Sequence, residues 1–149
     1  IDPGFGEHDP GPEIDGMGFD AYVERFGRPD WNDPHADLFP GGETIAAFHA
    51  RVAAALAAVF EQHQGKSVVV ACHGGVVDAT FRLLLQTSAT GSFELHTLNT
   101  SITEFAATVP SDTISALSWR LRRYNDVAHL HGLPAETPRV TPSDGGAER

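Results

Sequence analysis

The chain has 149 residues, of which 41% are hydrophobic and 20% are charged, a composition typical of one globular domain with a real core. Its formal net charge of -10 argues against nucleic acid or an anionic membrane as the main partner, because both bind basic surfaces. The single cysteine, Cys72, excludes an internal disulfide, so we expect a reduced, cytoplasmic setting. We also expect no membrane span, since no apolar run approaches the required length, and no signal peptide.

The N-terminal part is expected to consist of loops around one short helix. The first 18 residues are rich in Gly, Pro, Asp and Glu, which favour turns over regular structure. Apolar residues at helical spacing predict a helix over 19–26. Residues 29–42 carry Trp31 and are either a lid over a pocket or an ordinary packed surface loop.

The centre of the chain predicts a long helix followed by a buried strand. A continuous apolar stripe with many alanines predicts a helix from about residue 43 to 64, with His49 and His63 on its solvated side. Residues 68–72 read Val-Val-Val-Ala-Cys, and such a run without alternation favours a central strand covered on both faces. We therefore expect the Cys72 side chain to point into the core.

A second helix and a hairpin are predicted after this strand. The helix covers about 75–86, with Asp78 and Arg82 on its solvated side. Alternating residues over 101–109 and 114–124, joined by a Pro-Ser-Asp turn, predict two paired strands. A weaker strand signal covers 93–98. Helices on either side of a buried strand indicate the α/β class.

The junction at His73 is the main candidate site. The predicted strand ends at His73, and Gly74 and Gly75 then open a helix. A helix start offers free backbone N–H groups and the positive end of the dipole, and both favour anions. A histidine adds a proton donor or a cation near neutral pH. We interpret His73 as facing a phosphate, although a turn whose histidine only hydrogen-bonds a neighbour explains the pattern equally well.

Other kinds of site fit the chain less well. The Cys-His-Gly-Gly unit lacks the Lys and Ser or Thr of a P-loop, the three spaced glycines of a dinucleotide fold and the serine of a hydrolase elbow. Cys72 beside His73 could be a nucleophile, but its place in the strand argues for the core. No histidine pair has a firm metal spacing, so we predict no metal and no cofactor. Glu7, Asp9 and Glu13 could supply a general acid, though most surface acids are only solubilising.

Several of these segments together resemble one family. They are Pro40-Gly41-Gly42-Glu43-Thr44, a helix with Phe48 and Arg51, Gly65-Lys66, and the run from Val68 through His73-Gly74-Gly75 to Val77. With these motifs the chain resembles the second half of the histidine phosphatase (phosphoglycerate mutase-like) superfamily. Ile1-Asp2-Pro3-Gly4 is similar to the middle of that family, where a Glu-x-Asp-x-Gly segment precedes a lid, and residues 98–103 fit the start of a strand. The resemblance covers roughly residues 1–130.

This resemblance implies a three-layer α/β sandwich of the phosphoglycerate mutase-like type. The chain would be the second half of that domain, without its N-terminal strands. Residues 1–42 would be the lid and loop region, 43–133 the helix-strand-helix-hairpin part and 134–149 a disordered tail.

The resemblance also implies a phosphomonoester hydrolase that acts through a phosphohistidine. A histidine of an Arg-His-Gly motif attacks, a second histidine and two arginines hold the phosphate, and a glutamate protonates the leaving oxygen. Only the second histidine matches here, as His73, with the Gly74 N–H as a further donor; a shifted alignment leaves Glu7 as a substitute for the acid. The expected ligand is a small phosphorylated substrate or inorganic phosphate.

The nucleophile is not among the residues that match. Arg-His-Gly does not occur in the 149 residues, nor does the arginine of a Ser-x-Leu-x-Arg-like segment. We therefore expect this chain alone to be inactive, with a missing N-terminal half or a second copy as partner. Mutase activity and a catalytically silent phospho-ligand-binding protein are the alternatives within the family, and an unrelated flavodoxin-like domain is the alternative outside it.

Overall fold

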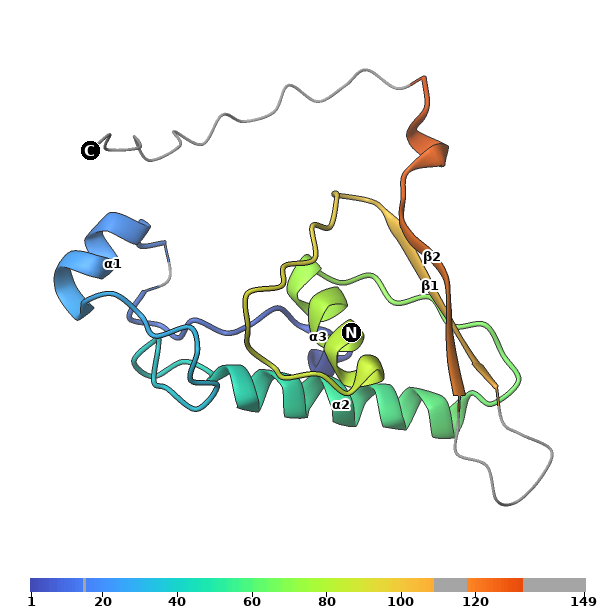
Figure 1. The fold of residues 1–149 in the computed structure, drawn as a ribbon, viewed down its shortest axis with the longest axis horizontal. Helices are drawn as coiled ribbons and strands as arrows, with labels where there is room; N and C mark the ends of the chain where they lie inside the picture. The colour runs from blue at the N-terminus through green and yellow to red at the C-terminus, as the bar shows by residue number, and fades with distance from the viewer. Residues whose placement is uncertain (15, 109–117, 133–149) are drawn as a thin grey trace.

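The computed structural model describes residues 1–14, 16–108 and 118–132. It contains the helices α1 (Phe19–Phe26), α2 (Ile45–Gln62) and α3 (Gly74–Leu85), the short 3-10 helices η1 (Pro3–Phe5) and η2 (Ala128–Leu130), and the strands β1 (Ile102–Thr108) and β2 (Ser118–Asp126) (Figure 1). The fold is therefore a mixed helix and strand structure with a small two-stranded sheet.

Helix α2 carries the core of the molecule. Thr44 is its N-cap, and the Thr44 hydroxyl accepts a hydrogen bond from a first-turn amide at 3.1 Å, which satisfies one free donor of the helix start. On the inner side of α2, Phe48 and Val52 pack against Val76 and Ala79 of α3. The buried stripe predicted for this helix thus faces the helix that begins at the candidate site.

By length and composition α2 also reaches the limit for a membrane-spanning helix, with 18 residues and a mean hydropathy of 1.2. The expectation that no apolar run approaches that length is therefore wrong by this criterion. In the structure α2 contacts α3 and η1, and 22% of the helix is buried against the described residues. Core helices of soluble proteins commonly pass the same test.

The two other predicted helices are confirmed. Helix α1 covers the expected residues 19–26, and α3 covers nearly all of 75–86. Tyr22 of α1 is buried, and its hydroxyl donates a hydrogen bond to the carbonyl of Leu38. This contact attaches α1 to the loop of residues 29–42, which has no regular structure, as expected.

The predicted central strand is the main correction. Residues 68–72 have no regular secondary structure, and they pair with no strand in the parts of the chain that the structure describes. Val69 is 94% exposed, and Val68 and Val70 are exposed as well. A β-branched run becomes a covered strand only where neighbouring strands and helices surround it, and the described residues provide neither. The Cys72 side chain is also exposed, so its predicted place in the core is wrong.

The predicted hairpin is confirmed. Strands β1 and β2 are antiparallel, with Ala107 opposite Trp119, and the register shifts near Glu104. Strand β2 is described from Ser118 and ends at Asp126, two residues later than the predicted end at 124. The weaker strand expected at 93–98 is not formed. The predicted turn, the first residues of the return strand and the C-terminal tail lie outside the described residues.

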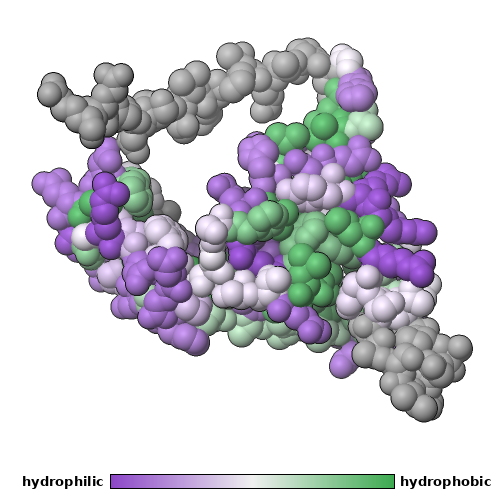
Figure 2. Space-filling view, viewed as in Figure 1, coloured by the Kyte–Doolittle hydropathy of each residue, from purple (hydrophilic) through white to green (hydrophobic). Residues whose placement is uncertain are grey.

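Aromatic contacts attach the hairpin to the helices. Phe81 of α3 lies edge-on to Phe105 of β1 and Tyr124 of β2, with ring centroids 4.9 and 5.3 Å away. Phe60 near the end of α2 lies 6.0 Å from Trp119. Edge contacts of this kind stabilise packing beyond the area that they bury. Figure 2 shows apolar side chains gathered at the centre of this face, over α3.

Candidate functional site

His73 lies where the segment 68–72, which has no regular structure, meets α3. It is the N-cap residue of α3, with φ -86° and ψ 169°, and its side chain makes no capping hydrogen bond. The residue is exposed, so its imidazole is open to a ligand. Gly74 and Gly75 follow as the first helical residues, and the first amides of a helix have no intrahelical acceptor. The structure thus places His73 beside free N–H donors.

A carboxylate already occupies this helix start. Glu7 Oε2 accepts a hydrogen bond from the Gly75 N–H at 3.1 Å, and Glu7 Oε1 accepts one from the His8 N–H at 2.8 Å. Negative charge is stabilised there by the donors and by the helix dipole. Sequence reasoning placed Glu7 only in a loop, because no local pattern reports a contact between residues 68 positions apart.

The glycine at position 75 makes this contact possible. A Cβ atom added to Gly75 would overlap Glu7 Oε1, so the Glu7 side chain would have to leave the helix start. A Cβ atom added to Gly74 would meet only the Thr97 Cβ, at an ordinary 3.6 Å. The two neighbouring glycines therefore differ: only Gly75 has to remain small for a carboxylate to reach the helix start.

Arg51 of α2 holds the segment that carries Glu7. Its Nη1 donates to the carbonyls of Pro3, Gly4 and Gly6 at 3.0, 3.2 and 3.1 Å, and its Nη2 donates to the carbonyl of Glu7 at 3.2 Å. One guanidinium thus satisfies four carbonyls of a loop that has little regular structure of its own.

Glu43 orients this guanidinium. Its two oxygens accept from Arg51 Nε at 2.7 Å and Nη2 at 2.8 Å, a bidentate pair. The hydrogen bond from Arg51 lowers the pKa of Glu43, and the hydrogen bond to Glu43 raises the pKa of Arg51. Both groups are therefore charged at neutral pH. Both belong to the motif that carried the family resemblance, but their role as an anchor for the N-terminal loop was not predicted.

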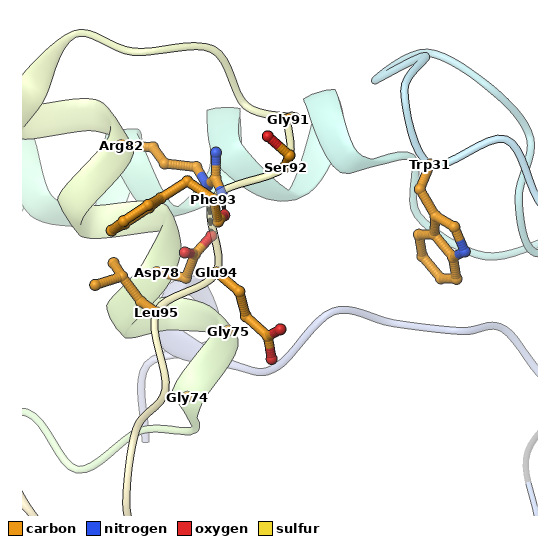
Figure 3. Close-up of a pocket in the computed structure, with 10 residues that line it drawn as sticks. All are labelled: Trp31, Gly74, Gly75, Asp78, Arg82, Gly91, Ser92, Phe93, Glu94 and Leu95. Atoms are coloured by element: carbon orange, nitrogen blue, oxygen red, sulfur yellow. Dashed lines mark hydrogen bonds and ion pairs between the residues drawn. The ribbon is translucent and has the colours of Figure 1, made fainter. Parts of the chain in front are cut away.

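A cavity of about 640 Å³ opens next to the α3 start (Figure 3). Its walls come from the first turns of α3, from the loop that follows α3, and from Trp31 in the loop of residues 29–42. The lining residues are Trp31, Gly74, Gly75, Asp78, Arg82, Gly91, Ser92, Phe93, Glu94 and Leu95. Figure 3 shows the Glu94 side chain directed toward the space between Gly75 and Trp31. The loop of residues 29–42, expected to be either a lid or a packed surface loop, thus contributes one side chain to the cavity.

Asp78 and Arg82 are not on a solvated face, as the sequence had led us to expect. Arg82 Nε donates to Asp78 Oδ2 at 2.6 Å, and the two side chains are only 12% and 27% exposed. Arg82 also donates to the carbonyls of Ser88 and Phe93. The loop after α3 folds back over this side of the helix and covers the pair, which helical spacing alone could not indicate.

His49 is a further correction, because it is buried rather than solvated. Burial lowers the pKa of His49; the nearby charge of Asp78 acts in the opposite direction, and that of Arg82 lowers the pKa further. The physical reason is that α3 packs against this side of α2. His49 is therefore a neutral residue of the core at pH 7, outside the candidate site.

Cys72 does not have the properties of a nucleophile. Partial desolvation, and after it the negative charge of Glu7, raise the pKa of its thiol. A reactive cysteine needs the opposite shift, because the thiolate is the nucleophile. In the parts of the chain that the structure describes, no group of three or more His, Cys, Asp or Glu side chains could hold a metal ion.

Comparison with known proteins identifies the family of this arrangement. The family model "Histidine phosphatase superfamily (branch 1)" matches residues 1–126, from the loop before η1 to the end of β2. No curated protein and no solved structure gives a significant match. The matched region contains the Glu43–Arg51 anchor, His73 and the α3 start.

Proposed function

The chain belongs to the histidine phosphatase superfamily, and from that premise we propose that His73 and the first amides of α3 hold the phosphoryl group of a phosphomonoester. The observation that carries this proposal is the Glu7 carboxylate on the Gly75 N–H. A carboxylate and a phosphate oxygen make the same charge-assisted hydrogen bond, so Glu7 occupies the position that a phosphate oxygen would take. His73 is exposed and is the N-cap residue of the same helix.

In the proposed reaction a nucleophilic histidine attacks phosphorus, and the bond between phosphorus and the leaving oxygen breaks. His73 and the Gly74 N–H stabilise the charge that develops on the phosphoryl oxygens. Once the phosphate has displaced Glu7 from Gly75, the Glu7 carboxyl group, when protonated, can pass its proton to the leaving oxygen. Water then hydrolyses the phosphohistidine to inorganic phosphate and free histidine.

The nucleophile has to reach the site on a strand beside residues 68–72. The carboxyl ends of parallel strands meet at one edge of a sheet, so a strand parallel to 68–72 would end next to His73. The exposed Val69 and the unpaired backbone of this segment suit such a partner. We propose that the N-terminal half of the domain, or a second copy of the chain, supplies the strand and completes a three-layer sandwich.

The same site also suits mutase activity, in which the phosphohistidine returns its phosphate to a second acceptor. A silent phospho-ligand-binding protein is favoured over both enzymes if no Arg-His-Gly segment ever joins the site. The 149-residue chain is expected to bind phosphate and not to hydrolyse phosphomonoesters by itself.

The test is a titration of this chain with inorganic phosphate, followed through the amide signals of His73, Gly74 and Gly75 by NMR. Replacing His73 with Gln should weaken binding about tenfold, because one charge-assisted hydrogen bond is lost. Glu7→Gln should tighten binding, because the competing internal carboxylate is gone. If phosphate binds equally well without the His73 imidazole, the proposal is wrong.

Two glycine variants provide a matched pair for the same titration. Gly75→Ala places a Cβ atom where the Glu7 oxygen now lies, so it should expel Glu7 and obstruct phosphate. Gly74→Ala has room for its Cβ atom and should bind phosphate like the original chain. Equal affinities for the two variants would mean that the anion does not approach Gly75.

A further inference from the structure

The cavity beside α3 has an aromatic wall and an excess of negative charge. Trp31 lines it from the loop of residues 29–42, and the Glu94 side chain extends into the space between Trp31 and Gly75 (Figure 3). We propose that this cavity accepts the leaving group of a phosphomonoester and selects leaving groups that carry an ammonium. The inference rests on the proposed function, in which the phosphoryl group lies at His73.

The charges of the lining support a cationic leaving group. Asp78, Arg82 and Glu94 are the charged residues of the cavity wall. Arg82 is bound to Asp78 at 2.6 Å, is only 12% exposed, and also donates to two backbone carbonyls. It therefore offers no free positive charge to a ligand.

Glu94 remains as an unneutralised carboxylate. It is exposed, and it has no hydrogen bond or ion pair to any residue that the structure describes. The protein as a whole carries a formal net charge of -10, which also favours cationic over anionic ligands. The negative electrostatic potential around Glu94 attracts an ammonium group and repels a carboxylate or a second phosphate.

Trp31 adds the second element of ammonium recognition. Indole is the aromatic ring that attracts cations most strongly, and a carboxylate beside it increases the attraction. Trp31 is 49% exposed as a residue, and its ring makes an edge contact with Phe39 at 5.8 Å between centroids. The indole is thus held in place while part of its surface stays accessible.

The loops that carry Trp31 and Glu94 are connected to each other. Thr90 Oγ1 donates a hydrogen bond to the carbonyl of Asn32 at 3.1 Å. Asn32 follows Trp31 directly, and Thr90 is part of the loop that leads to Glu94. This hydrogen bond joins the two loops across 58 positions of the chain, and Trp31 and Glu94 both line the cavity between them.

The test compares four ligands on the 149-residue chain by calorimetry and by the NMR signals of residues 73–75. Inorganic phosphate is the reference, phosphocholine carries the ammonium, 3-phosphoglycerate carries a carboxylate, and phenyl phosphate is aromatic and uncharged beyond its phosphate. We expect phosphocholine to bind about tenfold tighter than inorganic phosphate, as a cation–π contact with a half-exposed indole and an exposed carboxylate together allow. We expect 3-phosphoglycerate to bind more weakly than inorganic phosphate.

Variants of Glu94 and Trp31 separate the effect of the carboxylate charge on ligand preference from the effect of the aromatic wall. Glu94→Gln should remove most of the phosphocholine preference and improve 3-phosphoglycerate binding, and Trp31→Leu should reduce the preference while leaving inorganic phosphate unchanged. Glu61→Gln is the matched control, because Glu61 is an exposed acid outside the cavity. It should change none of the four affinities.

The outcomes distinguish this inference from the proposed function. If inorganic phosphate binds at residues 73–75 but phosphocholine binds no tighter, the proposed function stands and the ammonium selectivity is wrong. If phenyl phosphate binds tightest and Glu94→Gln has no effect, the cavity selects aromatic groups and the inference is again wrong. If none of the four ligands affects residues 73–75, both are wrong.

Discussion

The most specific prediction concerns Arg51, which anchors the N-terminal loop that carries Glu7. Replacing Arg51 with Ala removes six hydrogen bonds, two to Glu43 and four to carbonyls of the N-terminal loop. Breaking a buried ion pair by removing one partner costs about 3–5 kcal/mol, because the other charge stays buried. The Arg51 and Glu43 side chains are 26% and 18% exposed, so solvent screens part of this cost. We therefore expect a loss of about 2–3 kcal/mol in the free energy of unfolding.

The assay is urea unfolding at pH 7, with two comparison variants. Arg51→Lys keeps the charge but loses the bidentate geometry, so it should cost about half as much. Arg25→Ala is the matched control, because the ion pair of Arg25 with Glu13 is 56% and 51% exposed. It should change the free energy of unfolding by less than about 0.5 kcal/mol.

The dependence on pH follows from Glu43, whose pKa in the folded protein is lowered mainly by the Arg51 hydrogen bond. A lowered folded pKa contributes stability above the unfolded pKa and loses it as the pH falls through the folded value. The difference between the original chain and Arg51→Ala should therefore shrink below about pH 4. A cost at pH 7 no larger than that of Arg25→Ala, or an undiminished cost in acid, would refute the anchoring role of Arg51.

Three further predictions concern the core and the exposed segment. Because burial lowers the pKa of His49, its contribution to stability is complete above about pH 6.5 and declines below it; His49→Gln should flatten the fall in the urea midpoint from pH 7 to 5, and an unchanged slope would contradict this. Val52 is fully buried and Val69 is 94% exposed. Val52→Thr should therefore lower the free energy of unfolding by about 1–2 kcal/mol, and Val69→Thr should lower it by less than about 0.5 kcal/mol. A cost above about 1 kcal/mol at Val69 would mean that the segment is covered in solution. The raised pKa of Cys72 should make its thiol react with a disulfide reagent at pH 8 more slowly than free cysteine does. Glu7→Gln should speed this reaction, and an unaltered rate would count against the electrostatic effect of Glu7.

Local patterns predicted the helices well. The apolar spacing over 19–26 indicated α1, and the alanine-rich stripe indicated α2 with its buried Phe48 and Val52. These elements were predictable because helical periodicity is carried by neighbouring residues and does not depend on the rest of the fold. The hairpin was predictable for the same reason, from alternation on both sides of a turn.

The predictions that were wrong or incomplete concern features that depend on contacts between residues distant in sequence. The run at 68–72 has the composition of a covered strand, but coverage depends on neighbours that the described residues do not provide. His49 was expected on a solvated side because it is polar, yet it is buried, and the packing of α3 against α2 is not encoded in the neighbouring residues. The carboxylate of Glu7 reaches Gly75 only because Arg51 folds the N-terminal loop back, and no pattern within one segment encodes that contact.

The structure adds the surroundings of His73 to the hypothesis that the sequence motif suggested. The motif indicated a histidine before a helix start, and the fold adds an exposed imidazole, an internal carboxylate on the same helix start and an adjoining cavity. Sequence reasoning did not separate Gly74 from Gly75, because only the approach of Glu7 distinguishes them.

The most direct test of the account is the position of a bound oxyanion. A crystal of the 149-residue chain soaked with vanadate should show the ion at the start of α3. One vanadate oxygen should lie within hydrogen-bonding distance of the His73 imidazole, a second should lie at the Gly74 and Gly75 amides, and the Glu7 carboxylate should have moved away. Vanadate bound elsewhere, or a site left unoccupied with Glu7 still on Gly75, would contradict the proposed phosphoryl site.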